Sequence, residues 1–493
     1  MLVRHFAEIS RKQSFLLQPC AFVILASTLL FGLPAAAEVS FSAEAKTSGD
    51  TLNCATLSGD FNNDGILDIV SINDSTISFY RGLGKGKFAA PVNSSFSGPV
   101  TSAAVADLNG DGKLDIAYLQ GGIKTLLGNG DGTFTAGPTI NLSANAFGIV
   151  LADFNGDHIP DMALITCQPE QSCGVPVYLG QGNGNFTLSA TLNPTGVSNI
   201  AVGDFNGDGY QDIVIAETDD VAVYLGEGNG QFQTPITVSQ QSAKTLAVGD
   251  FYDDRIQSIA VENVVNGKPG QKVYVDTVRY SNGQLLSTKP QYVAEAGGLI
   301  GFSLDHGDLN GDFKDDLVLS GSYSTAQSSK GIPLNGYMLG TGKGTFDSMV
   351  TLPSRGNSDG LGFVRDLNLD SRHDVGIGWS DDYPKPSGIL VLLNQNATPN
   401  CDPPPANVLG VNVCAPMSGE TISPTYTFKA AGNAFNGICK RMELWIDGTK
   451  IGENLEDQLK IRTTLSAGTH TATFIAVDTF DNIYKEPVTF TVR

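Results

Sequence analysis

Asp204-Phe205-Asn206-Gly207-Asp208-Gly209-Tyr210-Gln211-Asp212 places oxygen side chains at positions 1, 3 and 5, a turn residue at position 6 and a carboxylate at position 9. Calcium takes about 6–8 oxygen ligands, and a looping backbone can direct such side chains, with the carbonyl of position 7, at one centre. The segment is not an EF-hand, because position 12 is Ile215 in a β-rich run instead of Glu. The stretch therefore predicts a calcium loop between two strands.

The pattern recurs along the chain. Further intact copies begin at Asp60, Asp107, Asp153, Asp308 and Asp366. A degraded copy begins at Asp250, with Tyr252 at position 3 and Ser258 at position 9, and we expect no tight metal binding there. The seven copies, called loops 1–7 in chain order, begin 47, 46, 51, 46, 58 and 58 residues apart. Such a period is typical of a solenoid or propeller of small β-units.

The six intact loops predict about six structural calcium sites. The alternative interpretation is a set of acidic surface turns without metal. The predicted ligands, with position 7 contributing its carbonyl, are Asp60, Asn62, Asp64, Ile66 and Asp68; Asp107, Asn109, Asp111, Lys113 and Asp115; Asp153, Asn155, Asp157, Ile159 and Asp161; Asp204, Asn206, Asp208, Tyr210 and Asp212; Asp308, Asn310, Asp312, Lys314 and Asp316; and Asp366, Asn368, Asp370, Arg372 and Asp374.

A glycine-rich motif, close to G-x-G-x-G-x-F, follows most loops. It occurs as Leu83-Gly84-Lys85-Gly86-Lys87-Phe88 and again at 127–134, 179–186, 225–232 and 339–346. The glycines suit a tight turn, and the Phe can anchor the returning strand in the core. Each unit then contains four strands, which predicts an all-β chain with a seven-bladed β-propeller. Residues 39–46 resemble the outer strand that the seventh unit lacks, so we expect the N-terminal strand to complete the last blade.

Residues 1–37 have the pattern of a cleavable signal peptide. Arg4, Arg11 and Lys12 precede an apolar run at 21–33, and Ala35-Ala36-Ala37 fits a cleavage site. The alternative is an uncleaved membrane anchor, although the run is short for a membrane span. We expect a mature chain without a transmembrane segment that is secreted, at the cell surface or in the periplasm.

The net charge of −21 is concentrated in the predicted metal loops, whose intact copies contain 18 aspartates at positions 1, 5 and 9. Six calcium ions would add 12 positive charges. The acidity therefore indicates a demand for metal, and it disfavours nucleic acid as a partner.

Six cysteines follow the predicted leader, an even number that favours disulfides in an exported chain. Cys167 and Cys173 flank a short segment between two strand-like runs, so we expect a disulfide across a hairpin. The pairing of Cys54, Cys401, Cys414 and Cys439 stays open: Cys401 with Cys414, and Cys414 with Cys439, both fit the sequence.

The composition changes after the repeats. We expect the propeller to span 38–396, a proline-rich linker to span 397–408 and an immunoglobulin-like β-sandwich to span 409–493. In the run Met442-Glu443-Leu444-Trp445-Ile446, alternation places Trp445 on the face opposite the aliphatic residues. An exposed Trp can stack on a sugar, so Trp445 is a candidate sugar contact, and packing against a neighbouring segment is the alternative.

The two repeated motifs resemble the FG-GAP or VCBS repeat family, which includes integrin α propeller heads, some fungal lectins and exported bacterial proteins. The resemblance covers about 39–395 and implies a seven-bladed propeller with calcium between the first two strands of most blades. It also implies a binding or adhesion role. The C-terminal region resembles bacterial Ig-like modules.

These observations favour a ligand-binding or adhesion module whose partner is an extracellular glycan or surface protein. The alternative is a polysaccharide lyase or hydrolase on a propeller scaffold. No nucleophile or metalloprotease motif supports an enzyme, and His158, His306, His373 and His470 each fit a loop or core role better than a catalytic one. We expect specificity to lie in long loops at 262–300 and 320–336. The sequence makes no prediction of the oligomeric state.

Overall fold

The computed structural model describes residues 41–493 except for short gaps. The residues left out are 1–40, 50–54, 73–75, 96–97, 99, 169–172, 218–219, 240–242, 255, 267–270, 297–298, 313, 326–327, 354–356, 369–372, 381–386, 396–409, 417, 434–438, 455–457 and 479–482. The predicted leader and linker therefore lie outside the described residues. The described residues form strands and turns without a helix, and so none of their elements is a helix that could span a membrane.

Seven antiparallel sheets of four strands, one of them with an added fifth strand, are found in the described residues up to 395. In the order of their loops they are β2 (Ala55–Gly59), β3 (Asp68–Ile72), β4 (Thr76–Tyr80) and β5 (Val92–Ser95); β6 (Ser102–Ala106), β7 (Asp115–Leu119), β8 (Gly122–Gly128) and β9 (Phe134–Asn141); β10 (Asn145–Ala152), β11 (Asp161–Cys167), β12 (Cys173–Gly180) and β13 (Phe186–Leu192); β14 (Asn199–Gly203), β15 (Asp212–Ala216), β16 (Asp220–Tyr224) and β17 (Ile236–Ser239); β18 (Ala243–Gly249), β19 (Ser258–Asn266), β20 (Gln271–Ser281), β21 (Gln284–Ser287) and β22 (Gln291–Ala296); β23 (Leu299–Gly307), β24 (Asp316–Thr325), β25 (Ser328–Met338) and β26 (Val350–Thr351); and β27 (Asn357–Arg365), β28 (Asp374–Ser380), β29 (Ser387–Asn394) and β1 (Phe41–Gly49).

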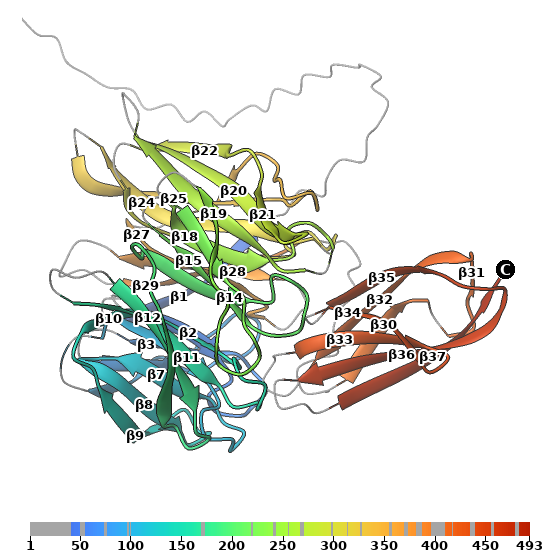
Figure 1. Ribbon diagram of the computed structural model, residues 1–493, viewed down its shortest axis with the longest axis horizontal. Coiled ribbons are helices and arrows are strands. Elements are labelled where there is room, and N and C mark those ends of the chain that lie inside the picture. The colour runs from blue at the N-terminus through green and yellow to red at the C-terminus, as the bar shows by residue number, and fades with distance from the viewer. Residues whose placement is uncertain are drawn as a thin grey trace, which may run out of the picture. The chain divides into compact units, whose positions relative to one another are not determined.

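The sheets follow one another in a regular series (Figure 1). The first strands of successive sheets contact each other in the order β2, β6, β10, β14, β18, β23 and β27. Each loop connects the first strand of its sheet to the second. This repeated arrangement is compatible with a β-propeller.

Each sheet is buried on both faces, which explains why the second strands are mostly apolar after their first residue. In β15, Ile213 and Ile215 pack toward the sheet of β11 and β12, whereas Val214 and Ala216 pack toward the sheet of β19. Side chains alternate between the faces of a strand, so a run without polar residues fills two interfaces. Seven such apolar clusters join the successive sheets.

The first and last sheets also share a core. Ile69 and Tyr80 of the first sheet pack with Ile389 and Val391 of the last sheet. The predicted pairing of the N-terminal strand with the last unit is confirmed, because β1 pairs with β29 over a register that runs from Phe41↔Asn394 to Gly49↔Ser387. The last sheet thus combines both ends of the repeat region.

The sequence predicts long loops at 262–300 and 320–336, and this prediction is wrong for most residues of both segments. The segments 262–300 and 320–336 mostly extend β19, β20, β24 and β25 and add β22, which pairs with β20 beside β21. Alternating β-branched and polar residues, as in Val273-Tyr274-Val275, favour such strand extension over loops.

The C-terminal region forms two sheets around one apolar core. One sheet contains β30 (Gly410–Ala415), β32 (Thr425–Asn433) and β35 (Gln458–Thr464). The other contains β31 (Thr421–Ile422), β37 (Ile483–Val492), β36 (Gly468–Asp478), β33 (Cys439–Ile446) and β34 (Thr449–Asn454). Phe428 and Ile461 of the first sheet and Leu444 and Phe474 of the second meet in this core.

Candidate metal centres

Loop 4 shows how the repeated aspartates are arranged. The position-1 carboxylate of Asp204 accepts hydrogen bonds from the backbone N–H groups of Gly207 (2.7 Å) and Gly209 (2.9 Å). At position 3, the Asn206 side-chain oxygen accepts from the N–H of Asp208 at 2.9 Å. The Asp208 carboxylate accepts from the N–H of Tyr210, also at 2.9 Å. The oxygen side chains at positions 1, 3 and 5 therefore fold the loop around themselves.

The position-9 carboxylate is the most buried member of each loop. Asp212 has no exposed surface, and its Oδ2 accepts from the N–H of Phe205 (2.9 Å) while its Oδ1 accepts from the N–H of Gly226 (2.7 Å). The same pair of bonds, from position 2 and from a residue at or just beyond the end of the third strand, occurs at Asp68, Asp115, Asp161, Asp316 and Asp374. Position 9 thus connects the loop to the end of the third strand.

Burial raises the pKa of five of these carboxyls, and the negative charges at positions 1 and 5 raise it further, against the lowering effect of the backbone hydrogen bonds; the five are Asp68, Asp115, Asp161, Asp212 and Asp316. The pKa rises to about 7 for Asp68 and Asp212 and to about 6 for Asp115 and Asp161. That of Asp316 lies well above its ordinary value for the same reasons. A cation at the loop would offset this repulsion and favour the ionised form.

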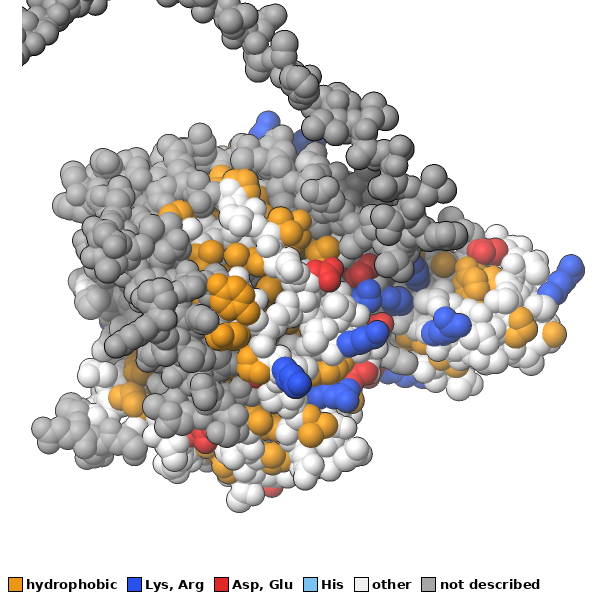
Figure 2. Space-filling view, turned by 90° about the horizontal axis from the view of Figure 1, so that it is seen from above, with side chains coloured by type: hydrophobic (Ala, Val, Ile, Leu, Met, Phe, Trp, Pro, Cys, Tyr) orange, Lys and Arg blue, Asp and Glu red, His pale blue; other side chains and the backbone are white. Residues whose placement is uncertain are grey.

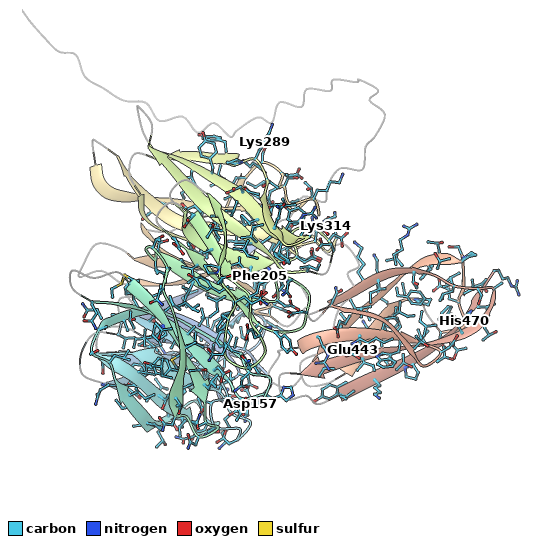
Figure 3. All side chains as sticks on the ribbon, viewed as in Figure 1. Asp157, Phe205, Lys289, Lys314, Glu443 and His470 are labelled. Carbon is cyan, nitrogen blue, oxygen red and sulfur yellow. A yellow bond between two sulfur atoms is a disulfide. The ribbon has the colours of Figure 1, made fainter. Side chains whose placement is uncertain are left out.

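The donor set of each intact loop fits a hard divalent cation in its chemistry. Side-chain oxygens at positions 1, 3, 5 and 9 and a carbonyl at position 7 are ligands that calcium prefers. Among the residues that the structure describes, no three His, Cys, Asp or Glu side chains are gathered around a common point. Figure 3 labels Asp157, an exposed position-5 residue on loop 3, and Phe205, which is enclosed by side chains.

The first glycine of each glycine turn has a role that the sequence analysis missed. A Cβ on Gly226 would lie 2.3 Å from the carbonyl oxygen of Gln211, the position-8 residue. The equivalent contacts are as short at Gly82, Gly128, Gly180 and Gly340. In these five units, the absence of a Cβ therefore lets the third strand approach the loop closely enough to donate to the position-9 carboxylate.

The glycine turn of the first unit begins at Gly82, two residues before the Gly84 of the sequence motif. Gly82 forms the bridge to Phe88 and donates to Asp68, as Gly226 pairs with Phe232 and donates to Asp212. The turn of the first unit therefore begins at Gly82, and Leu83 is an exposed turn residue that does not correspond to the Leu before the later turns.

The position-2 carbonyls of loops 1, 2, 3, 5 and 6 link these loops to the next sheet. Phe154 is buried, and its carbonyl accepts from the N–H of Gly230 in the next glycine turn at 2.9 Å. Its ring meets Phe232 edge-on, with the centroids 5.5 Å apart. Gly132, Gly184 and Gly344 make equivalent bonds to Phe61, Leu108 and Phe251. The predicted core role of the turn Phe holds here, and its partner is the position-2 residue of the preceding unit.

Asn394 replaces the missing glycine turn of the seventh unit. Its backbone N–H donates to Asp374 Oδ1 at 2.8 Å, as the first glycine does elsewhere. Its side-chain Nδ2 donates to the carbonyls of Leu309 (2.6 Å) and His373 (3.2 Å), and the former bond replaces that of the third glycine. One buried asparagine therefore makes both connections.

Two loops carry a lysine beside the position-5 carboxylate. Lys314 Nζ lies 2.5 Å from Asp312 Oδ2, and Lys113 Nζ lies 3.4 Å from Asp111 Oδ2. The carbonyls of these lysines are the predicted position-7 ligands. In loop 7, Asp370 and Arg372 lie outside the described residues, whereas Asp366 and Asn368 are described.

The structure contains a Cys167–Cys173 disulfide between β11 and β12, whose Cα atoms are 4.2 Å apart. Cys414 is also disulfide-bonded. Cys54 and Cys401 lie outside the described residues, as does the side chain of Cys439.

Trp445 lies on the face of β33 opposite the core, as alternation predicts. Met442, Leu444 and Ile446 are buried, and Trp445 is half-buried with its indole N–H donating to Glu443 at 2.8 Å. Burial alone would raise the pKa of Glu443, but bonds from Arg441, Trp445 and Lys450 lower it to about 2. The indole is thus held in one orientation by a satisfied ionic network.

The histidines considered for catalysis have other partners. His306 Nδ1 lies 3.1 Å from the buried Asp315 carboxylate, and His158 is an exposed loop residue 3.7 Å from Asp153. His470 bonds to Asp447 and to the carbonyl of Ser466. His373 lies at position 8 of loop 7, directly before Asp374.

The comparison with protein families matches an FG-GAP-like repeat to residues 60–118, 117–164, 165–215 and 204–261. These matches cover loops 1–5. No curated protein sequence matches the chain.

Two solved structures are similar in part. One is a lectin from Agrocybe aegerita, described as recognising non-reducing terminal N-acetylglucosamine, with 19% identity and a TM-score of 0.43 over 61% of this chain and 80% of the lectin. The other is the S. cerevisiae core factor, with 8% identity and a TM-score of 0.46 over 73% of this chain and 61% of that one. Neither similarity is high enough to indicate what this chain binds.

Proposed function

We propose that this chain, whose residues 60–261 match FG-GAP-like repeats, is an exported calcium-stabilised propeller that binds an extracellular glycan or surface protein. The observation that carries the proposal is the repeated burial of a position-9 carboxylate whose pKa is raised by its surroundings. A buried carboxylate with two acidic neighbours is unfavourable unless a cation accompanies it. Calcium bound only by the folded loops would stabilise the fold by mass action.

The seven sheets are the blades of this propeller, and the C-terminal pair of sheets is an Ig-like sandwich. Support for seven blades comes from the seven apolar interfaces between successive sheets, the last of which joins the final sheet to the first. The first and last sheets pack on each other, so neither has a free interface, and the pairing of β1 with β29 brings both ends of the repeat region into one sheet. Six equivalent loops favour a structural role for calcium over a regulatory one.

Export is supported by two features of the chain. The first 37 residues have the basic, apolar and small-residue segments of a signal peptide. The Cys167–Cys173 disulfide is typical of an oxidising compartment. The mature chain would then meet millimolar calcium in many extracellular settings, which suits weak extracellular sites.

The ligand surface that we propose is the outer part of the fifth sheet. Tyr292 on β22 is 52% exposed and meets Tyr274 on β20 edge-on at 5.8 Å. Tyrosines are enriched at binding surfaces because they combine a large apolar ring with a polar hydroxyl. On the face shown in Figure 2, acidic side chains are scattered and do not form a continuous field, so apolar and uncharged contacts remain available.

The first test is thermal unfolding of the mature protein with calcium and after chelation, with bound calcium counted in parallel. We expect about six ions and a large loss of stability on chelation. A protein that binds no calcium and melts unchanged would overturn the metal half of the proposal.

Binding is tested on a glycan array and on immobilised surface-protein fractions, using wild type, Tyr292→Ser and Trp445→Ala. Leu188→Ser is the matched control, since Leu188 is equally exposed (54%) on the outer strand of another sheet. We expect Tyr292→Ser to weaken binding and Leu188→Ser to leave it unchanged. Equal binding by all variants would exclude both aromatic surfaces, and retention of no ligand would favour a purely structural spacer.

A further inference from the structure

The degraded loop 5 keeps the backbone course of the intact loops. The N–H of Asp254 donates to Asp250 Oδ1 at 3.2 Å, and the N–H of Ile256 donates to Asp254 Oδ1 at 3.2 Å. The equivalent bonds in loop 1 are 3.1 and 2.9 Å long. Ser258 at position 9 accepts from the N–H of Phe251 at 3.2 Å, as the carboxylate does elsewhere. Loop 5 has therefore lost predicted metal ligands and kept these three hydrogen bonds.

The cationic side chain of Arg279 contacts both the altered position 3 and the acidic position 5 of this loop. Arg279, on β20, places its guanidinium carbon 4.6 Å from the centroid of the Tyr252 ring at position 3. Its Nη1 lies 3.6 Å from Asp254 Oδ2 at position 5. Guanidinium groups bind both aromatic faces and carboxylates, so these two neighbours form a suitable pair for it.

Tyr252 is held in place for this contact. Its hydroxyl lies 2.9 Å from Thr277 Oγ1, and its ring packs so closely on the next glycine turn that a Cβ on Gly344 would lie 2.2 Å from it. The ring is thus fixed between the sixth unit and the guanidinium. An asparagine at position 3, as in the intact loops, would offer a metal ligand but no such surface.

Counted over the carboxylates at positions 1, 5 and 9, an intact loop with a bound calcium ion and loop 5 with Arg279 have the same net charge. An intact loop has three carboxylates at positions 1, 5 and 9, and a divalent ion would leave a net charge of −1. Loop 5 has two carboxylates at these positions, because Ser258 replaces the buried aspartate. The charges of Asp253 at position 4 and Arg255 at position 6 offset each other, so that Arg279 also leaves −1. The loss of the buried carboxylate and the presence of a monovalent cation are therefore complementary changes.

We propose that Arg279 supplies in loop 5 the positive charge that calcium supplies in the intact loops, so that this loop is ordered without metal. The inference rests on the proposed calcium role of the other loops. It explains how the fifth sheet keeps its place in the series although its loop lacks the position-9 carboxylate. Arg279 is a positioning residue that acts through Tyr252 and Asp254.

Amide hydrogen exchange of the mature protein, with calcium and after its removal, tests the inference. In wild type, the loop 5 amides of Asp254 and Ile256 should exchange at the same rate in both conditions, whereas the loop 4 amides of Asp208 and Tyr210 should exchange several-fold faster without calcium. Arg279→Gln should accelerate loop 5 exchange several-fold in both conditions, and Arg279→Lys should restore part of the protection, since it keeps the charge without the planar stacking group.

Unchanged loop 5 exchange in Arg279→Gln, or loop 5 exchange in wild type that depends on calcium, would overturn the inference. If the amide exchange of loop 4 does not depend on calcium, the proposed metal role fails instead. The two failures are therefore distinguishable in one experiment. A second measurement counts bound calcium in a variant whose loop 5 carries the residues of an intact loop at positions 3, 6 and 9. This variant, Tyr252→Asn/Arg255→Gly/Ser258→Asp, is compared with and without Arg279→Gln. We expect one additional ion only when Arg279 is replaced, and an additional ion bound equally well beside Arg279 would contradict its role.

Discussion

Replacement of Gly226 by alanine is expected to destabilise the repeat region more than any glycine substitution in an open position. The added Cβ would lie 2.3 Å from the carbonyl oxygen of Gln211. An ordinary carbon–oxygen contact is about 3.3–3.6 Å, so the end of the third strand must retreat by about 1 Å. The N–H of Gly226 now lies 2.7 Å from Asp212, and such a shift would take it out of hydrogen-bonding range.

The cost follows from these two changes. A hydrogen bond to a charged group contributes about 1.5–3 kcal/mol, and forcing atoms into a packed region costs about 1–3 kcal/mol. We therefore expect Gly226→Ala to lower the free energy of unfolding by roughly 3 kcal/mol or more. The loss should persist in metal-free protein, because it arises from backbone contacts.

Urea denaturation with and without calcium measures the effect. The matched control is Gly174→Ala on β12, where the nearest atoms to an added Cβ lie at 3.6 Å and the change should stay within about 0.5 kcal/mol. Equal stabilities for the two variants would refute the view that the first glycine of the turn is required by close approach to the loop.

Three further outcomes are expected. Asn394→Ala should cost about 1–3 kcal/mol for each buried carbonyl that loses its donor, seen as a lower urea midpoint. In metal-free protein, the raised pKa of Asp212 means that the folded state binds its proton more tightly than the unfolded state, so stability should fall as pH rises from about 4 to above 7, and calcium should remove this slope; a flat metal-free profile would contradict it. A hydrogen bond to Asp447 raises the pKa of His470, so its stabilising effect should be present below pH about 6.5 and lost as pH rises through the folded pKa; His470→Gln should therefore lower the melting temperature more at pH 6 than at pH 9, and equal losses at both would argue against it.

Much of this architecture follows from short-range patterns in the sequence. The alternation of oxygen side chains in 204–212 predicts a loop between strands, and the continuous apolar run after it predicts a strand buried on both faces. The incomplete seventh unit and the strand-like residues 39–46 together predict the pairing of β1 with β29. These predictions succeed because each depends on residues adjacent in the chain or on counting repeats.

The parts that were missed depend on contacts between units. The need for glycine at 226 comes from a carbonyl 15 residues away, and the amide of Asn394 meets a carbonyl 85 residues away. Arg279 has no recurring pattern, because it compensates for changes in one loop only. The fifth and sixth units were expected to hold long loops because their second and third strands, of 9 to 11 residues, are longer than the five-residue strands β15 and β16 of the fourth unit.

The pairing of β1 with β29 also determines when the last sheet can form during synthesis. In this sheet 353 positions separate Phe41 from its partner Asn394, so β1 cannot pair with β29 until almost the entire repeat region has been synthesised. Contacts between such distant residues form slowly. A nascent chain that crosses a membrane from its N-terminus would carry an unpaired strand edge throughout its passage and could complete its fold only on the far side. In a chain exported as proposed, this interval would be a stage of exposure to aggregation and proteolysis.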